Sequence, residues 1–187
     1  MALGPLDRKQ AKVVLFKVAD LLDSLGIEFC LVCGSALGAH RDKDFCVGDK
    51  DIDLAAKHEL LVGKIPEILK ELPAGVRVKT NVAPFKYDRA LHLVWDGVRV
   101  DIVDFALQED KQERFCANGR RNYCIVHPKR MFDNMGEVEL FGRKFLVPSP
   151  IEEYLSREYG PSWRVPDPAA CVSKTRVYGY DYGVLDA

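Results

Sequence analysis

Residues 34–56 read GSALGAHRDKDFCVGDKDIDLAA, a glycine–serine pair followed by three aspartates at alternate positions and an apolar run. Carboxylates this close repel one another, so such an arrangement usually serves to hold a positive group. Successive side chains of a strand point to opposite faces, which puts Asp51 and Asp53 on one face and Ile52 and Leu54 on the other. The stretch therefore predicts a strand that presents two carboxylates away from the core.

A third acid comes from LHLVWDGVRVDIVDF at 91–105. Two β-patterned runs flank Asp96-Gly97, a dipeptide that favours a two-residue hairpin turn. Counting from that turn places His92 opposite Asp101. Asp101 shares its face with Arg99 and Val103, whereas Val100 and Ile102 lie on the core side. The hairpin thus supplies a third carboxylate, and a histidine that could orient it or shuttle a proton, although a histidine satisfied within a strand is the plainer interpretation.

Three carboxylates from two strands form an oxygen cluster suited to a hard cation, Mg²⁺ or alternatively Mn²⁺. We predict metal binding and catalysis by Asp51, Asp53 and Asp101. Gly34-Ser35, taken as a turn before a short helix, would offer backbone amides and a hydroxyl to phosphate groups, although Ser35 could simply cap that helix. Together these features indicate metal-assisted phosphoryl or nucleotidyl transfer.

A calcium-binding loop is the first alternative, because Asp49, Asp51 and Asp53 would occupy its first, third and fifth positions. Such a loop needs glycine at the sixth position and glutamate at the twelfth. The chain has Leu54 and Leu60 there. The calcium loop is therefore rejected. Asp49 could itself bind the ion, or could lie in the loop or behind the metal ligands.

Composition sets limits on partners and location. The chain has 187 residues, 27 Lys plus Arg against 28 Asp plus Glu, and six cysteines that do not form a disulfide pattern. A balanced charge argues against a protein that wraps duplex nucleic acid. We expect no transmembrane segment and no secretory leader, because no sufficiently long apolar run is present. These features favour a cytoplasmic location.

Hydrophobic periodicity predicts an alternation of helices and strands. The helices are expected at 8–25, at 58–72 with an interruption at Pro66, and at 150–160. The strands are expected at 27–33 and 52–57 and in the hairpin. We expect a core over 1–127, with an extension over 128–187 packed on it as one structural unit.

The sequence resembles the LicD/fukutin family of the nucleotidyltransferase superfamily, in three ordered blocks. The first block is the quoted stretch; the others are VDIVDF at 100–105 and YLSREYGPSW at 154–163. Within the first block the matching positions are Gly34, Leu37, Gly38, Arg41, Phe45, Asp49, Asp51, Ile52 and Asp53. The chain departs from the family pattern at Gly48, where tryptophan is usual, and at Lys50, where aspartate is usual.

The resemblance implies an α/β (α+β) nucleotidyltransferase fold, with a small mixed β-sheet, flanking helices and a C-terminal helical extension. It implies transfer of a phospho-alcohol, such as phosphocholine or ribitol phosphate, from a CDP-activated or other nucleotide donor to a hydroxyl acceptor such as a glycan. Asp51 and Asp53 would bind Mg²⁺, and Asp101 would complete the metal site or act as general base.

Further substrate-binding residues are predicted with open alternatives. Arg41 could clamp a phosphate or form a surface ion pair, and Lys43 and Lys86 could add phosphate contacts. Tyr159 and Trp163 could stack on a base or cover a cationic group, or could be packing residues. These side chains would extend a donor site that includes Gly34, Ser35, Arg41, Lys43 and His92.

Three alternatives remain open at this stage. Asp104, one face over from Asp101, could be the functional acid instead. The same acids could serve a small-molecule nucleotidyltransferase that releases pyrophosphate. The fold could also serve as a non-catalytic nucleotide-binding module.

Overall fold

The computed structural model describes residues 4–82, 89–107, 112–115, 123–166 and 183–184. Its helices are α1 (Arg8–Ser24), α2 (Cys33–Leu37), the π-helical turn η1 (Gly38–Asp42), α3 (His58–Val62), α4 (Ile65–Glu71), α5 (Arg130–Asp133) and α6 (Ile151–Tyr159). Its strands are β1 (Phe29–Leu31), β2 (Asp51–Lys57), β3 (Arg77–Val82), β4 (Arg89–Trp95), β5 (Val98–Leu107), β6 (Gln112–Phe115), β7 (Tyr123–Pro128), β8 (Gly136–Leu140), β9 (Arg143–Val147) and β10 (Gly183–Val184).

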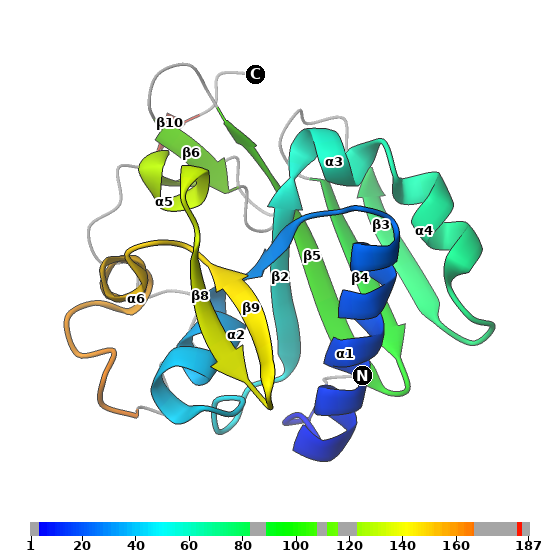
Figure 1. Cartoon of the computed structure of the whole chain (residues 1–187), viewed down its shortest axis with the longest axis horizontal. Coiled ribbons are helices and arrows are strands. Elements are labelled where there is room, and N and C mark those ends of the chain that lie inside the picture. Colours follow the sequence, from blue (N-terminus) through cyan, green and yellow to red (C-terminus); the bar gives the residue numbers. More distant parts are fainter. Residues whose placement is uncertain (1–3, 83–88, 108–111, 116–122, 167–182, 185–187) are drawn as a thin grey trace.

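The strands form one mixed sheet (Figure 1). Its main path runs in the order β10-β7-β6-β5-β2-β1-β9-β8. Strand β5 is long enough to pair along one edge first with β4, which continues to β3, and then with β6. The β2–β5 and β1–β9 pairs are parallel, whereas the hairpin pairs are antiparallel. This is the mixed α/β architecture that the sequence predicts.

One face of the central strands is apolar and covered by helices. Helix α1 lies across β4 and β5, with α4 beside it (Figure 1). Helix α1 begins after Asp7, whose carboxylate accepts hydrogen bonds from two backbone amides of the first turn. The buried side chains of its inner face recur at helical spacing and are Ala11, Val14, Leu15, Val18, Ala19 and Leu22. On the face of the central strands that these helices cover, the buried apolar side chains include Ile52, Leu54, Leu91, Leu93, Val100 and Ile102.

The predicted hairpin is confirmed residue by residue. Trp95 pairs with Val98 and His92 with Asp101. Asp96 and Gly97 both have positive φ, 49° and 82°, as a tight hairpin turn of this type requires. The hairpin therefore brings His92 and Asp101 to the same face of the sheet.

One local prediction was wrong. Gly34 and Ser35 lie within the first turn of α2, which begins at Cys33, and not in a turn before the helix. The segment after 128, where the sequence analysis expected one helix, contains that helix and also a β8–β9 hairpin that joins the sheet through β1. Its turn uses Phe141 and Gly142, both with positive φ. A bulky residue in that conformation is uncommon, so the turn carries no usual sequence signal.

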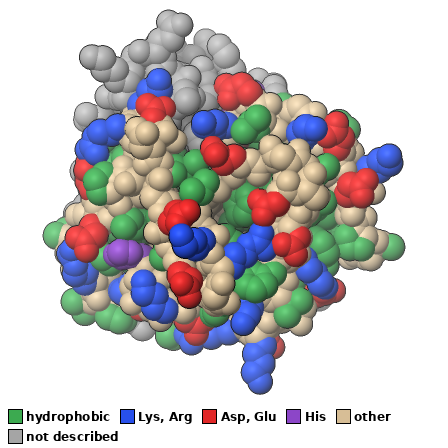
Figure 2. All heavy atoms as spheres, viewed as in Figure 1, with side chains coloured by type: hydrophobic (Ala, Val, Ile, Leu, Met, Phe, Trp, Pro, Cys, Tyr) green, Lys and Arg blue, Asp and Glu red, His purple; other side chains and the backbone are tan. Residues whose placement is uncertain are grey.

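None of the helices in the described ranges combines enough length and apolar character to cross a bilayer. On the face shown in Figure 2, acidic and basic side chains are interspersed and do not form one large patch of a single sign.

Candidate active site

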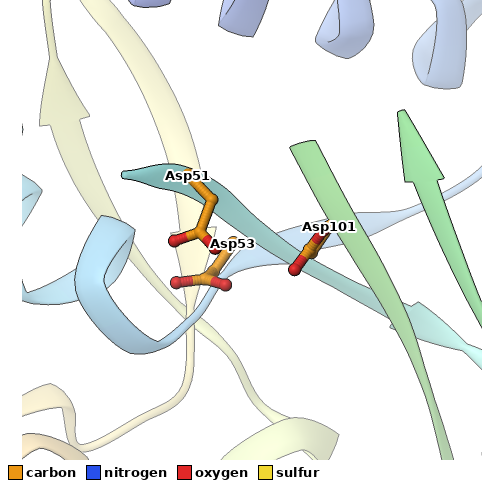
Figure 3. A group of neighbouring side chains, drawn as sticks. All are labelled: Asp51, Asp53 and Asp101. Atoms are coloured by element: carbon orange, nitrogen blue, oxygen red, sulfur yellow. The ribbon is translucent and has the colours of Figure 1, made fainter. Parts of the chain in front are cut away.

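Three carboxylates meet on the face of the sheet opposite α1. Asp51 and Asp53 stand two residues apart on β2, and Asp53 lies directly beside Asp101 of the parallel strand β5. One oxygen from each of Asp51, Asp53 and Asp101 lies within 4.8 Å of the others. Figure 3 shows these three side chains and the strands that carry them. Asp51 and Asp101 are buried. The register of β2 against β5 therefore builds the acid cluster that the sequence predicts.

Asp101 is held by two neighbours. His92 Nδ1 lies 2.7 Å from Asp101 Oδ1, and Arg99 Nε donates to the same oxygen at 2.8 Å. Arg99 Nη2 donates to Asp101 Oδ2. Burial alone would raise the pKa of Asp101, but the hydrogen bonds from His92 and Arg99 outweigh it and lower that pKa. Asp101 is therefore a fixed, ionised carboxylate.

Arg99 is a site residue whose role the sequence did not reveal. It lies opposite Asp51 in the β2–β5 register, and its Nε lies 3.7 Å from Asp51 Oδ2. Its pKa is raised, first by the hydrogen bonds to Asp101, while burial opposes the shift. The guanidinium therefore bridges the two strands that supply the acids. Its position two residues before Asp101 put it on this face, but its contact with Asp51 depends on long-range register.

The donor set fits a divalent cation. Carboxylate oxygens are the ligands that Mg²⁺ and Mn²⁺ take in proteins. Asp51, Asp53 and Asp101 offer three such oxygens within 4.8 Å of one another. These residues could hold the ion that the sequence analysis predicts.

Helix α2 is tied to the acid-bearing strand. The backbone amide of Asp53 donates to Ser35 Oγ at 2.9 Å, and Ser35 is 1% exposed. A Cβ at Gly34 would lie 2.5 Å from Asp49 Oδ2. Ser35 thus positions Asp53, and Gly34 leaves room for the buried Asp49, which lies behind the cluster and accepts from the amide of Lys50. The amino-acid types at 34 and 35 have a structural reason in addition to their predicted phosphate contacts.

Gly38 also lets another backbone segment approach closely. A Cβ at Gly38 would lie 2.4 Å from the carbonyl oxygen of Asp44 and 2.8 Å from the amide nitrogen of Cys46. Gly38 therefore lets the 43–48 loop pack on η1. Gly48, at the position where the family has tryptophan, has φ 85°, a left-handed conformation that favours glycine.

Arg41 and Lys43 lie at the end of η1, next to this loop. Arg41 donates to both carboxylate oxygens of Asp42 at 2.8 Å and to the carbonyl of Trp163 at 3.0 Å. It therefore connects η1 to the segment after α6. Lys43 is exposed at the end of η1. Lys86, another predicted phosphate contact, lies outside the described residues.

Two tyrosines of α6 lie near the site. The Tyr154 hydroxyl accepts from the amide of Cys33 at 2.9 Å, which attaches α6 to the start of α2. Burial, and then the nearby Cys33, Glu158, Asp53 and Asp49, raise the pKa of Tyr159 well above its usual value. Tyr159 is therefore a neutral phenol beside the acids. Trp163 is 5% exposed and packs near His40 and Arg164, an environment typical of a packing residue.

Asp104, the alternative to Asp101 as the functional acid, is paired with His58. Its Oδ2 lies 2.5 Å from His58 Nδ1, and it stands opposite Ala56 of β2. It belongs to the face that carries Ile102, whereas Asp101 belongs to the other face. The acid cluster therefore includes Asp101 and not Asp104.

The arrangement defines the chain as a protein with the nucleotidyltransferase fold. A lincosamide antibiotic adenylyltransferase, LnuA, with bound lincomycin, superimposes with a TM-score of 0.50 at 16% identity, covering 78% of this chain and 82% of the other. A Thermotoga maritima protein classed as a nucleotidyltransferase superimposes with a TM-score of 0.52 at 20% identity, covering 80% and 84%.

Among curated proteins, the chain is similar to a transferase. It is 27% identical over 164 residues to the Homo sapiens ribitol-5-phosphate transferase FKTN and 28% identical to that of Macaca fascicularis. Each match covers 85% of this chain and 34% of the relative, so the chain spans about a third of the length of the relatives it matches. No family model matches the chain.

Proposed function

We propose that the chain transfers a phospho-alcohol, such as ribitol phosphate or phosphocholine, from a CDP-activated donor to a hydroxyl acceptor such as a glycan, with Mg²⁺ or Mn²⁺. The observation that carries the proposal is the convergence of Asp51, Asp53 and Asp101 within 4.8 Å on neighbouring strands. The similarity to ribitol-5-phosphate transferases supports the choice of transferred group.

The proposal assigns a role to each residue. Asp51 and Asp53 would hold the divalent ion, and Asp101 would either complete its ligands or take the proton of the acceptor hydroxyl. The bound ion would neutralise charge on the phosphate oxygens. His92 keeps Asp101 in place through its hydrogen bond. Gly34 and Ser35 lie at the start of α2 beside Asp53, where the donor phosphate would approach.

The bond changes follow from this assignment. The acceptor oxygen attacks the phosphorus that carries the alcohol, the phosphoanhydride bond breaks, and CMP leaves with the bridging oxygen. The proton of the acceptor hydroxyl passes to Asp101 or to water. An ion held by Asp51 and Asp53 would supply positive charge for this reaction, and Asp101 is the candidate acceptor of the proton.

The test separates product classes. The protein is incubated with Mg²⁺ and a CDP-alcohol or a nucleoside triphosphate, together with sugar acceptors that carry free hydroxyls. CMP released together with a phospho-alcohol-modified acceptor supports the proposal. The variant Asp51→Asn should lose that product, and the matched variant Asp104→Asn, on the other face of the sheet, should retain it.

Nucleotidyl transfer is the second candidate, supported by the fold that the chain shares with a lincosamide adenylyltransferase. The same acids would then direct the acceptor oxygen to the α-phosphorus of a nucleoside triphosphate. Release of pyrophosphate in the assay above would favour this candidate. Nucleotide-induced thermal stabilisation without any product would instead favour the binding module.

A further inference from the structure

Arg99 occupies the acid cluster in the way a bound cation would. Its guanidinium contacts both oxygens of Asp101 and lies 3.7 Å from Asp51 Oδ2. It is a positive group that contacts carboxylates of both β5 and β2. A metal ion that uses these same acids needs some of the same oxygens.

Competition between Arg99 and a metal ion centres on the oxygens of Asp101. An ionised carboxylate offers about four lone-pair positions. Three are directed at neighbours here: His92 and Arg99 share Oδ1, and Arg99 also takes Oδ2. One position remains, on Oδ2, and an ion bound there would lie beside the positive Nη2 of Arg99. Binding through both oxygens of Asp101 would require a contact on Oδ1, from His92 or Arg99, to break.

We propose that Arg99 exchanges partners during binding: it neutralises Asp101 and Asp51 before the divalent ion arrives, and then turns to a phosphate of the nucleotide donor. This inference rests on the proposed function for the identity of the donor. The guanidinium leaves carboxylates and meets a phosphate, two groups that accept its paired N–H donors in the same fork geometry.

The position of Arg99 suits that second partner. Its side chain is 33% exposed, so solvent reaches it although its guanidinium contacts the acids. It stands beside Asp51, on the face where an ion and its phosphate ligands would meet. Its charge would add to that of the ion and offset part of the negative charge of the three carboxylates and the incoming diphosphate.

The first experiment measures Mn²⁺ affinity without nucleotide, by calorimetry, for wild type, Arg99→Met and Arg99→Lys. Loss of the competing guanidinium should tighten Mn²⁺ binding by about tenfold in Arg99→Met. Arg99→Lys keeps the charge and loses the fork, so its affinity should lie between the two. Thermal unfolding in EDTA checks that each variant is folded, and Arg99→Lys decides the question if Arg99→Met does not fold.

The matched control is Arg77→Met. Arg77 stands in the same cross-strand row, since it pairs with Val94, which pairs with Arg99. It lies two strands away, about 10 Å at the usual strand spacing. Its removal tests the effect of charge alone, and Mn²⁺ affinity should change by less than about twofold. An equal gain in both variants, or no gain in Arg99→Met, overturns the competition.

The second experiment measures CDP binding in saturating Mn²⁺. Arg99→Met should weaken CDP binding by about tenfold or more, because it loses a charge-assisted bidentate contact. Arg77→Met should retain wild-type affinity. Unchanged CDP affinity in Arg99→Met, or a wild type that does not bind CDP, overturns the phosphate contact.

These experiments distinguish failure of the Arg99 exchange from failure of the proposed transfer reaction. A wild type that binds Mn²⁺ and CDP as expected, yet forms no product from any CDP-alcohol, refutes the proposed reaction and leaves the exchange of Arg99 intact. A wild type that forms product while Arg99→Met matches it in Mn²⁺ and CDP affinity refutes the exchange alone.

Discussion

Strand β5 carries two aspartates that are each hydrogen bonded to a histidine, on opposite faces of the sheet. Asp101 lies 2.7 Å from His92, and Asp104 lies 2.5 Å from His58. Both aspartates are buried. Considered alone, the two pairs offer the same chemistry.

Their neighbours on β2 differ. Asp101 lies beside Asp53, and Asp51 is near enough to complete a cluster. Asp104 lies beside Ala56, on the face that carries the apolar side chains. An Asp–His pair therefore becomes part of a candidate metal site only where the adjacent strand supplies further carboxylates. Substitutions at Asp51 and in the two Asp–His pairs test whether that difference in neighbours decides function.

The largest effect is expected from removing the neighbouring acid itself. Asp51→Asn keeps the shape of the side chain and removes one ligand charge, so transfer activity should fall by about 1000-fold, or about 4 kcal/mol of transition-state stabilisation. The fold should remain, because one source of carboxylate repulsion is relieved. Steady-state rates and denaturant unfolding measure the two effects.

Mn²⁺ binding provides the control for this variant. Calorimetry should show weaker binding in Asp51→Asn and wild-type binding in Asp104→Asn. Near wild-type activity in Asp51→Asn would show that the acid cluster is not the metal site.

The two aspartates of β5 are compared directly by Asp101→Asn and Asp104→Asn. Asp101→Asn should reduce the rate by about 100-fold, because it loses a metal ligand or a general base. Asp104→Asn should change the rate of the folded enzyme by less than about threefold, since it touches neither acid of β2. Rates are normalised to the folded fraction from circular dichroism. If Asp104→Asn shows the larger loss, the assignment of the two faces is reversed.

The histidines give a smaller effect of the same sign. His92→Gln should lower the rate by about tenfold, the low end for a residue that orients a metal ligand. His58→Gln is its matched control and should leave the rate unchanged. A purely structural role for His92 would alter the unfolding midpoint but not Mn²⁺ affinity, so affinity is measured alongside the rate. Equal effects from both histidines would remove the distinction between the pairs.

Local patterns in the sequence were sufficient to predict which face carries Asp51 and Asp53 and how the hairpin pairs. Alternation put Asp51 and Asp53 on one face, and the turn at Asp96-Gly97 set the pairing of His92 with Asp101. Both depend on neighbours close in the chain. The structure confirms the mixed α/β fold, because the elements with clear periodicity, such as α1, β2 and the β4–β5 hairpin, form its centre.

Features that depend on distant contacts could not be predicted. The contact of Arg99 with Asp51 needs the parallel register of β2 and β5, which no local pattern encodes. Gly34 was interpreted as part of a phosphate turn, whereas its missing Cβ leaves room for Asp49 from a later loop. The turn at Phe141 was missed because a bulky residue there carries no turn signal.

The smallest expected effect concerns acid stability in EDTA. Hydrogen bonds from His92 and Arg99 outweigh burial and hold the pKa of Asp101 below its usual value, so ionised Asp101 stabilises the folded state. That contribution is present above the unfolded pKa of about 3.9 and is lost as pH falls through the lower folded pKa. The free energy of unfolding of wild type should therefore lose its advantage over Asp101→Asn as pH falls below about 4. Urea unfolding of both proteins between neutral and acidic pH measures the gap. A gap that widens on acidification would mean that burial, and not the two hydrogen bonds, dominates the environment of Asp101.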